Sequence, residues 1–138
     1  MTNRRDIFLL AAIPAMGALA ADGSSARLPN VTMDPAHATL DRQPFGDLRT
    51  YFDGPTDQLR SMTAGSLLLK PEMSPHPPHR HPEEEIMVVT EGSGEIVVEG
   101  KVSQVGPGSM MYCAADKLHG VKNTGTQPLL FYFYKWRA

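Results

Sequence analysis

Turn-forming residues divide the chain into short segments, and this feature limits the possible folds more than any other. Twelve glycines and twelve prolines occur among 138 residues. From residue 48 onward they separate short runs that are rich in β-branched, aromatic and other apolar residues. No run beyond the first 20 residues shows helical periodicity. Segments that recur roughly every 8 to 12 residues predict an all-β sandwich or barrel. The predicted strands cover residues 48–52, 62–70, 85–90, 95–98, 101–105, 109–113, 119–123 and 129–136.

The first 20 residues have the pattern of a signal peptide. Arg4 and Arg5 precede an apolar stretch over residues 7–20, which ends in the cleavage-type sequence Ala-Leu-Ala. A membrane-spanning helix needs about 20 apolar residues, so this stretch predicts no stable membrane anchor. The paired arginines resemble the bacterial twin-arginine export signal, although general secretion and a buried N-terminal helix are alternatives. We expect a periplasmic or secreted protein that begins near Ala21.

The rest of the chain is expected to form a single domain. Residues 21–47 are polar and without sustained periodicity, which predicts an irregular arm or an edge strand, and residues 48–138 are predicted to form the barrel. The formal net charge is -2, and the basic residues are scattered. This distribution argues against nucleic acid as a partner. A single cysteine, Cys113, excludes an intrachain disulfide and is predicted to be a buried apolar residue.

Histidines are concentrated in one short proline-rich segment. Three of the five histidines are His76, His79 and His81. In an extended strand alternate side chains share a face, so His79 and His81 would project to the same side. Glu85 lies an even number of residues further on and could return its carboxylate to the same point if the chain bends. A fourth ligand of a metal site must come from elsewhere, and His119 is the remaining histidine of the strand region.

The same residues resemble the two motifs of the cupin family. The first motif, H-x-H followed by E and then by G after six residues, is present as His79, His81, Glu85 and Gly92. The second motif ends in H-x-x-x-N, which residues 119–123 contain. The resemblance covers about residues 65–136. It implies an all-β double-stranded β-helix, the cupin or jelly-roll barrel, that binds one divalent metal through His79, His81, Glu85 and His119.

Some positions near these motifs depart from the family or have a role that the sequence leaves open. The departures are at turn positions, where Met73 replaces a usual glycine and residues 114–116 replace Pro-x-Gly. Glu83 and Glu84 are predicted to form a solvated acidic rim, because only Glu85 has the family interval to the motif glycine. His76 could face the site or lie in solvent.

The predicted ligand set suggests a metalloenzyme. Three imidazoles and one carboxylate suit Mn, Fe, Zn, Ni or Co, and octahedral coordination would leave two positions for water or substrate. The family resemblance implies dioxygenase, sugar isomerase or lyase type chemistry on an oxygen-rich small molecule. The candidates for an additional acid or base are His76, Tyr112 and Lys117. A dioxygenase would need an apolar pocket, lined by residues such as Met87, Met111, Tyr112, Phe131 and Phe133.

Two other functions compete with or accompany catalysis. A domain this short has little sequence for a lid or a dedicated base, so a non-catalytic periplasmic module that binds a small ligand or stores metal is the alternative. The segment 129–136 is apolar on both faces of the predicted strand. One face would meet the core and the other a partner subunit, which predicts a homodimer.

Overall fold

The computed structural model describes residues 26–138, and this part of the chain contains nine strands and no helix. The predicted signal peptide lies outside the described residues. Within them, no segment forms a helix of the length and apolarity that a membrane span requires. The strands are β1 (Thr39–Gln43), β2 (Gly46–Gly54), β3 (Ser61–Leu69), β4 (Glu84–Glu91), β5 (Gly94–Val98), β6 (Lys101–Val105), β7 (Met110–Cys113), β8 (His119–Lys122) and β9 (Leu129–Arg137).

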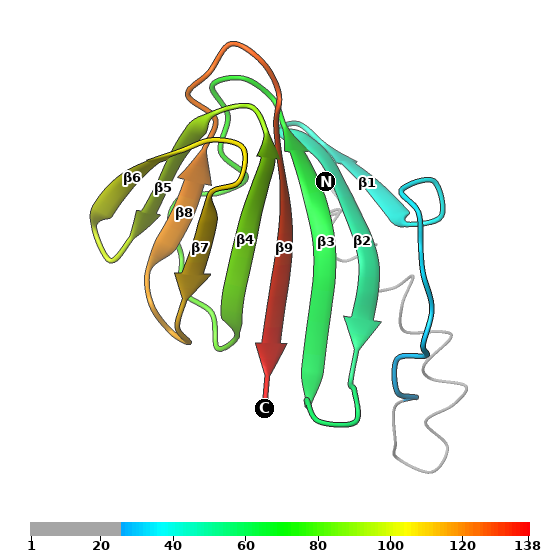
Figure 1. Cartoon of the computed structure of the whole chain (residues 1–138). Coiled ribbons are helices and arrows are strands. Elements are labelled where there is room, and N and C mark those ends of the chain that lie inside the picture. Colours follow the sequence, from blue (N-terminus) through cyan, green and yellow to red (C-terminus); the bar gives the residue numbers. More distant parts are fainter. Residues whose placement is uncertain (1–25) are drawn as a thin grey trace, which may run out of the picture.

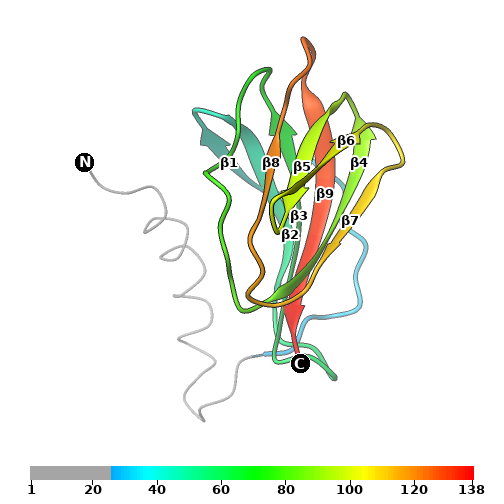
Figure 2. The same cartoon turned by 90° about the vertical axis from the view of Figure 1, so that its left-hand side faces the viewer.

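The strands form two antiparallel sheets of unequal size (Figure 1). The larger sheet has the order β1-β2-β3-β9-β4-β7 and the smaller sheet the order β6-β5-β8. The smaller sheet lies in front of the larger one when the molecule is viewed from its side (Figure 2). After β4 the chain therefore passes back and forth between the two layers, as in a jelly roll. The all-β jelly-roll barrel predicted from the sequence is confirmed.

The hydrophobic core fills the space between the two sheets. Along each strand, alternate side chains point to the core, which explains the pairs of buried residues two positions apart. Leu67 and Leu69 of β3, for example, are buried, whereas Leu68 between them is only partly buried. The smaller sheet contributes Ile96 and Val121. The larger sheet contributes Leu67, Leu69, Met87, Val89, Met111, Cys113, Leu129 and Phe131.

An edge strand precedes the barrel strands predicted from the sequence. β1 pairs only with β2, through a tight hairpin in which Gln43 faces Gly46. Gly46 has a φ of 154°, and a Cβ atom there would clash with the main-chain oxygen of Leu68. Only glycine permits this close approach of β2 to β3. The first strand of the larger sheet thus lies within residues 21–47.

Asn123 connects two loops at one end of the barrel, the one between β3 and β4 and its own between β8 and β9. Its side-chain amide donates hydrogen bonds to the carbonyl oxygens of Leu69 at 2.9 Å and Gln127 at 2.8 Å. Its side-chain oxygen accepts a hydrogen bond from the backbone N–H of Gly125 at 3.0 Å. The backbone N–H of Asn123 also donates to the carbonyl of Met73. The asparagine of the second motif therefore helps to position the loop that leads to the histidines.

We expect Asn123→Ala to lower the free energy of unfolding by about 2 to 4 kcal/mol, because it leaves several polar groups near a fully buried position without partners. Urea denaturation followed by circular dichroism would measure this change. Asn30→Ala, at an exposed position, is the control and should change stability little. An equal effect of the two substitutions would contradict this role of Asn123.

Candidate metal centre

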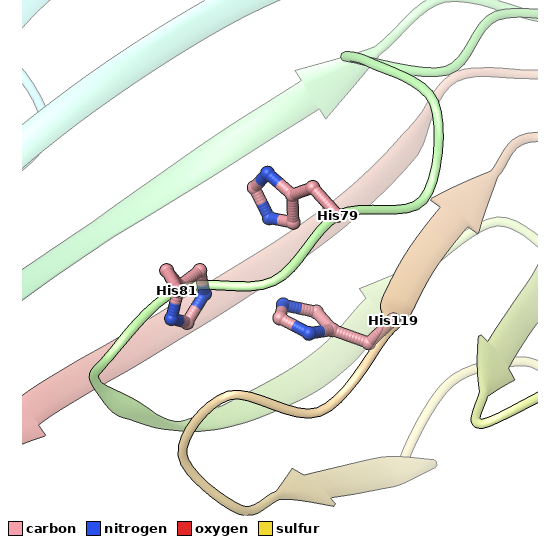
Figure 3. A group of neighbouring side chains, drawn as sticks. All are labelled: His79, His81 and His119. Atoms are coloured by element: carbon pink, nitrogen blue, oxygen red, sulfur yellow. The ribbon is translucent and has the colours of Figure 1, made fainter.

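Three histidine side chains from two distant segments meet beside the smaller sheet (Figure 3). One ring nitrogen from each of His79, His81 and His119 lies within 4.8 Å of the others. His79 and His119 form an antiparallel bridge in which the N–H of each donates to the carbonyl of the other, at 2.9 and 3.0 Å. Such a pair places both side chains on one face, and His81, two residues later, shares that face.

Glu85 brings a carboxylate to the same three histidines. Its Oε2 atom lies 3.1 Å from Nε2 of His81 and 2.8 Å from Nε2 of His119. Glu85 and His119 are buried, whereas His79 and His81 are partly exposed. The structure therefore brings together all four residues that the sequence analysis predicted as ligands. Solvent reaches this group, which we call the histidine–glutamate cluster, from the side of His79 and His81.

Main-chain carbonyls orient two of the rings. The Nδ1 atom of His119 donates a hydrogen bond to the carbonyl of Lys117 at 2.9 Å, and Nδ1 of His81 donates to that of Glu83 at 3.1 Å. When neutral, both rings then present the lone pair of Nε2 to the carboxylate of Glu85. A lone pair and a carboxylate repel each other unless a cation, either a proton or a metal ion, lies between them. These residues therefore fit a divalent metal, for which such second hydrogen bonds are typical.

The charged state of the histidine–glutamate cluster follows from these contacts. The hydrogen bond with Glu85 raises the pKa of His119, despite the burial of the ring. Burial of Glu85 opposes ionisation, but the hydrogen bonds and charges of His119 and His81 outweigh it and lower the pKa of the carboxyl. Burial, followed by repulsion from His76 and the other two imidazoles, lowers the pKa of His79 to about 4. His79 is thus neutral at neutral pH, as a metal ligand must be.

His76 lies beside the cluster but does not join it. Its ring stacks on that of His79, with the centroids 3.7 Å apart and the planes at 25°. Its Nδ1 atom is 2.8 Å from the carbonyl oxygen of Pro77. His76 also lines a cavity of about 540 Å³ together with Val97 and Lys122. These two residues alternate with the buried residues of their strands, so the cavity lies against the outer face of the smaller sheet.

The other two candidates for an acid or base lie away from the histidines. Tyr112 lies between two buried residues of β7, so its side chain is on the outer face of the sheet, where its hydroxyl donates to Glu84 at 2.9 Å. The Nζ atom of Lys117 lies 3.8 Å from a carboxylate oxygen of the exposed Glu99. Only the carbonyl oxygen of Lys117 reaches the histidine–glutamate cluster. The structure therefore brings neither of these two side chains to the site.

Of the five predicted pocket residues, all except Tyr112 point into the barrel. Met87, Met111 and Phe131 belong to the buried core, and Phe133 packs against it. Cys113 is buried as predicted, with Sγ 3.5 Å from Nδ1 of His119. These apolar residues form the wall behind the histidine–glutamate cluster.

Glu83 has a role that the sequence analysis missed. We expected it to be solvated, but its carboxylate lies 3.2 Å from Nδ1 of His81 and its carbonyl accepts a hydrogen bond from the same atom. Its position two residues after His81 was the available signal, because a turn there brings the two residues together. Glu84 likewise accepts a hydrogen bond from Tyr112 and is only partly exposed.

The fold and the clustered histidines define a jelly-roll barrel with a potential metal site, and a family model agrees with this class. The model of the cupin domain matches residues 65–134, half of the chain, so the protein belongs to the cupin family. No curated protein sequence matches the chain.

Solved structures share the fold at low sequence identity. KdgF from Halomonas sp. is 17% identical with a TM-score of 0.61, and the match covers 83% of this chain and 96% of KdgF. The polyketide cyclase RemF from Streptomyces resistomycificus is 23% identical with a TM-score of 0.63, covering 80% and 81% of the two chains. A predicted oxalate decarboxylase from Thermotoga maritima is 19% identical with a TM-score of 0.61, covering 78% and 100%. At these identities the likeness is one of fold.

We expect the metal-free protein to lose stability through His79 as the pH falls from about 6.5 to about 4. In this pH range His79 binds a proton in the unfolded chain but not in the folded protein. His119, whose pKa is raised, instead contributes stability that is lost as the pH rises above its unfolded value, so its effect lies at higher pH. Between about pH 7 and about pH 5, the wild type should lose about 1 kcal/mol more stability than His79→Gln, a figure reduced for partial exposure of the ring.

Urea denaturation in the presence of a chelator at the two pH values would measure this difference. His37→Gln is the matched control, because His37 is exposed and lies in a separate part of the chain. It should retain the wild-type dependence on pH. The same dependence in His79→Gln would show that His79 is not the group responsible.

Proposed function

We propose that the protein binds one divalent transition metal through His79, His81, Glu85 and His119. We further propose that it is a metal-dependent enzyme acting on an oxygen-rich small molecule after export. One observation carries the proposal. Two imidazoles direct Nε2 at a single carboxylate oxygen while their Nδ1 atoms are held by main-chain carbonyls. This arrangement is balanced only when a cation lies among these groups.

The donor atoms limit the choice of metal. Three imidazole nitrogens and one carboxylate oxygen suit Mn, Fe, Co, Ni or Zn. When bound, such an ion supplies Lewis-acid or redox chemistry to an oxygen-bearing substrate. The partial exposure of His79 and His81 supports entry of a small molecule from their side.

Apolar side chains line the opposite side of the site and exclude water from it. Met87 and Phe133 are paired across β4 and β9, two residues along from Glu85, and both pack in the core. They exclude water from behind the carboxylate, which strengthens the electrostatic interactions there. A substrate would therefore lie between this wall and the exposed side of the histidines.

The reaction type is proposed only as a class. Of the three candidates for a separate acid or base, His76 is the one beside the histidine–glutamate cluster. Because related folds support different reactions, the shared fold does not select among dioxygenase, sugar isomerase and lyase type chemistry. The proposal is therefore metal-centred catalysis on a small oxygen-rich molecule.

A non-catalytic module that binds a small ligand or stores metal is the second candidate. It is favoured by the positions of Tyr112 and Lys117, whose side chains point away from the cluster and do not reach it as acid or base. Turnover assays with metal-loaded protein against a panel of sugars, uronates and phenolics would distinguish the two. Turnover by the wild type but not by His119→Ala would support the enzyme. An absence of turnover with every metal tested would support the binding module.

We expect the protein purified from its native compartment to carry close to one metal ion per chain, and His119→Ala to lose most of it. The substitution removes a buried ligand whose ring is already oriented by Lys117. Elemental analysis by mass spectrometry would measure the metal, and circular dichroism would confirm that the variant is folded. His37→Ala, which removes an exposed histidine, should retain the metal. Unchanged metal content in folded His119→Ala would refute the ligand role.

We also propose that the outer face of the larger sheet forms a homodimer interface. Met110, Tyr112 and Tyr134 on this face are 66%, 57% and 41% exposed. The strand register places them next to Ile86 and Val88, so they form a continuous apolar surface over β7, β4 and β9. Large exposed apolar surfaces of this kind are typical of protein interfaces.

We expect the wild type to be a dimer at micromolar concentration and a Met110→Glu, Tyr134→Glu double variant to be a monomer. Burying the two new charges in the interface would be unfavourable. Size-exclusion chromatography with light scattering would measure the masses. Val102→Glu is the control, because Val102 is 55% exposed but belongs to the smaller sheet. A monomeric wild type would exclude the proposed dimer.

A further inference from the structure

One level of the larger sheet carries polar residues instead of core residues on its inner face. β9 pairs with β3 without a register shift, and this end of β4 pairs in the same way with β9 and β7. These positions are therefore aligned across five strands. Two residues further along, the inner face is apolar, with Phe133 beside Met87. Four of the aligned residues are polar, namely Asp53, Thr63, Lys135 and Glu85, and the fifth, Cys113 of β7, belongs to the core.

Lys135 occupies the middle of this level. It alternates with Phe131 and Phe133, which face the core, so its side chain starts on the same inner face. Its cross-strand neighbours are Glu85 on one side and Thr63 on the other. Directly opposed residues have Cβ atoms about 5 Å apart, so the long side chain of Lys135 begins beside the histidine–glutamate cluster. The hydrogen bond with Glu85 raises the pKa of His119, and the positive charge of Lys135 opposes this rise.

The ammonium group of Lys135 has no anionic partner in the described part of the chain, where it forms neither an ion pair nor a hydrogen bond. The two potential partners in its row are engaged elsewhere. Oε2 of Glu85 faces the two imidazoles, and the hydroxyl of Thr63 donates to Asp53 at 3.0 Å. Lys135 is partly buried as a residue, and its positive charge is left for a solvent ion or a ligand to balance.

We propose that Lys135 binds a carboxylate group of the substrate, so that the site selects small molecules that carry an acid group beside the oxygen directed at the histidines. The inference rests on the proposed function, because it names the substrate class of the same site. Lys135 is then a specificity-determining residue. A neutral sugar would leave its charge without a partner, and this loss favours acids over neutral compounds.

The neighbouring charges favour a carboxylate over a more highly charged anion. Lys135 lies in a row with two acidic residues, Asp53 and Glu85. A phosphate group with nearly two negative charges would be repelled by both, whereas a carboxylate brings a single charge. A lysine also binds one oxygen as a point charge and does not require the bidentate geometry that an arginine offers.

Isothermal titration calorimetry of the protein with its resident metal would test the proposal, with malonate as the probe. Malonamate, in which one carboxylate is replaced by a neutral amide, is the matched ligand. We expect Lys135→Met to weaken malonate binding at least about tenfold and malonamate binding much less. Lys135→Arg should retain most of the affinity for malonate. Lys101→Met, which removes an exposed lysine of β6, should behave as the wild type.

Metal content and circular dichroism of every variant separate the possible outcomes. Equal affinity for malonate in the wild type and in folded, metal-containing Lys135→Met would overturn the role of Lys135 while leaving the metal centre intact. The same holds if the wild type with its metal does not bind malonate. Binding that depends on Lys135 but persists in metal-free His119→Ala would support the role of Lys135 and count against the metal-centred function.

Discussion

The backbone pairing of His79 with His119 is the contact on which the site depends. The two residues are about 40 positions apart in the chain, and two short hydrogen bonds hold the segment before β4 against β8. This bridge sets the face on which both rings lie, and with it the direction of His81. Without it, the histidines of the first motif would have no fixed relation to that of the second. Backbone hydrogen bonds thus do the positioning, and the side chains are free to bind.

The histidine–glutamate cluster concentrates polar groups at the end of an apolar core. Burying Glu85 and His119 is unfavourable by itself, and the hydrogen bonds from the far side of the rings to main-chain carbonyls offset only part of this. A cation among the four side chains would offset the remainder. Metal binding and folding stability are therefore expected to be coupled in this protein. For Lys135, which has no anionic partner among the described residues, we propose that a substrate carboxylate balances the charge.

The alternation of side chains between the two faces of a strand separates the two surfaces to which we assign functions. On β9, Phe133 and Lys135 face inward to the core and the site, whereas Tyr134 between them faces outward. On β7, Cys113 faces inward and Tyr112 outward. Neighbouring residues thus serve the site and the proposed dimer interface, and shifting a strand by one residue would exchange them.

The sequence by itself determined the class of the fold and the predicted ligand set. Glycine and proline mark the ends of short strands through local backbone preferences, and the spacing of His79, His81, Glu85 and His119 is the pattern of the cupin family. Only the tertiary structure decided which side chains lie next to this set. It placed Lys135 beside Glu85 and turned Tyr112 outward. The physical reason is that these relations depend on the register between strands far apart in the chain, which is set by packing of the whole barrel and by no local pattern.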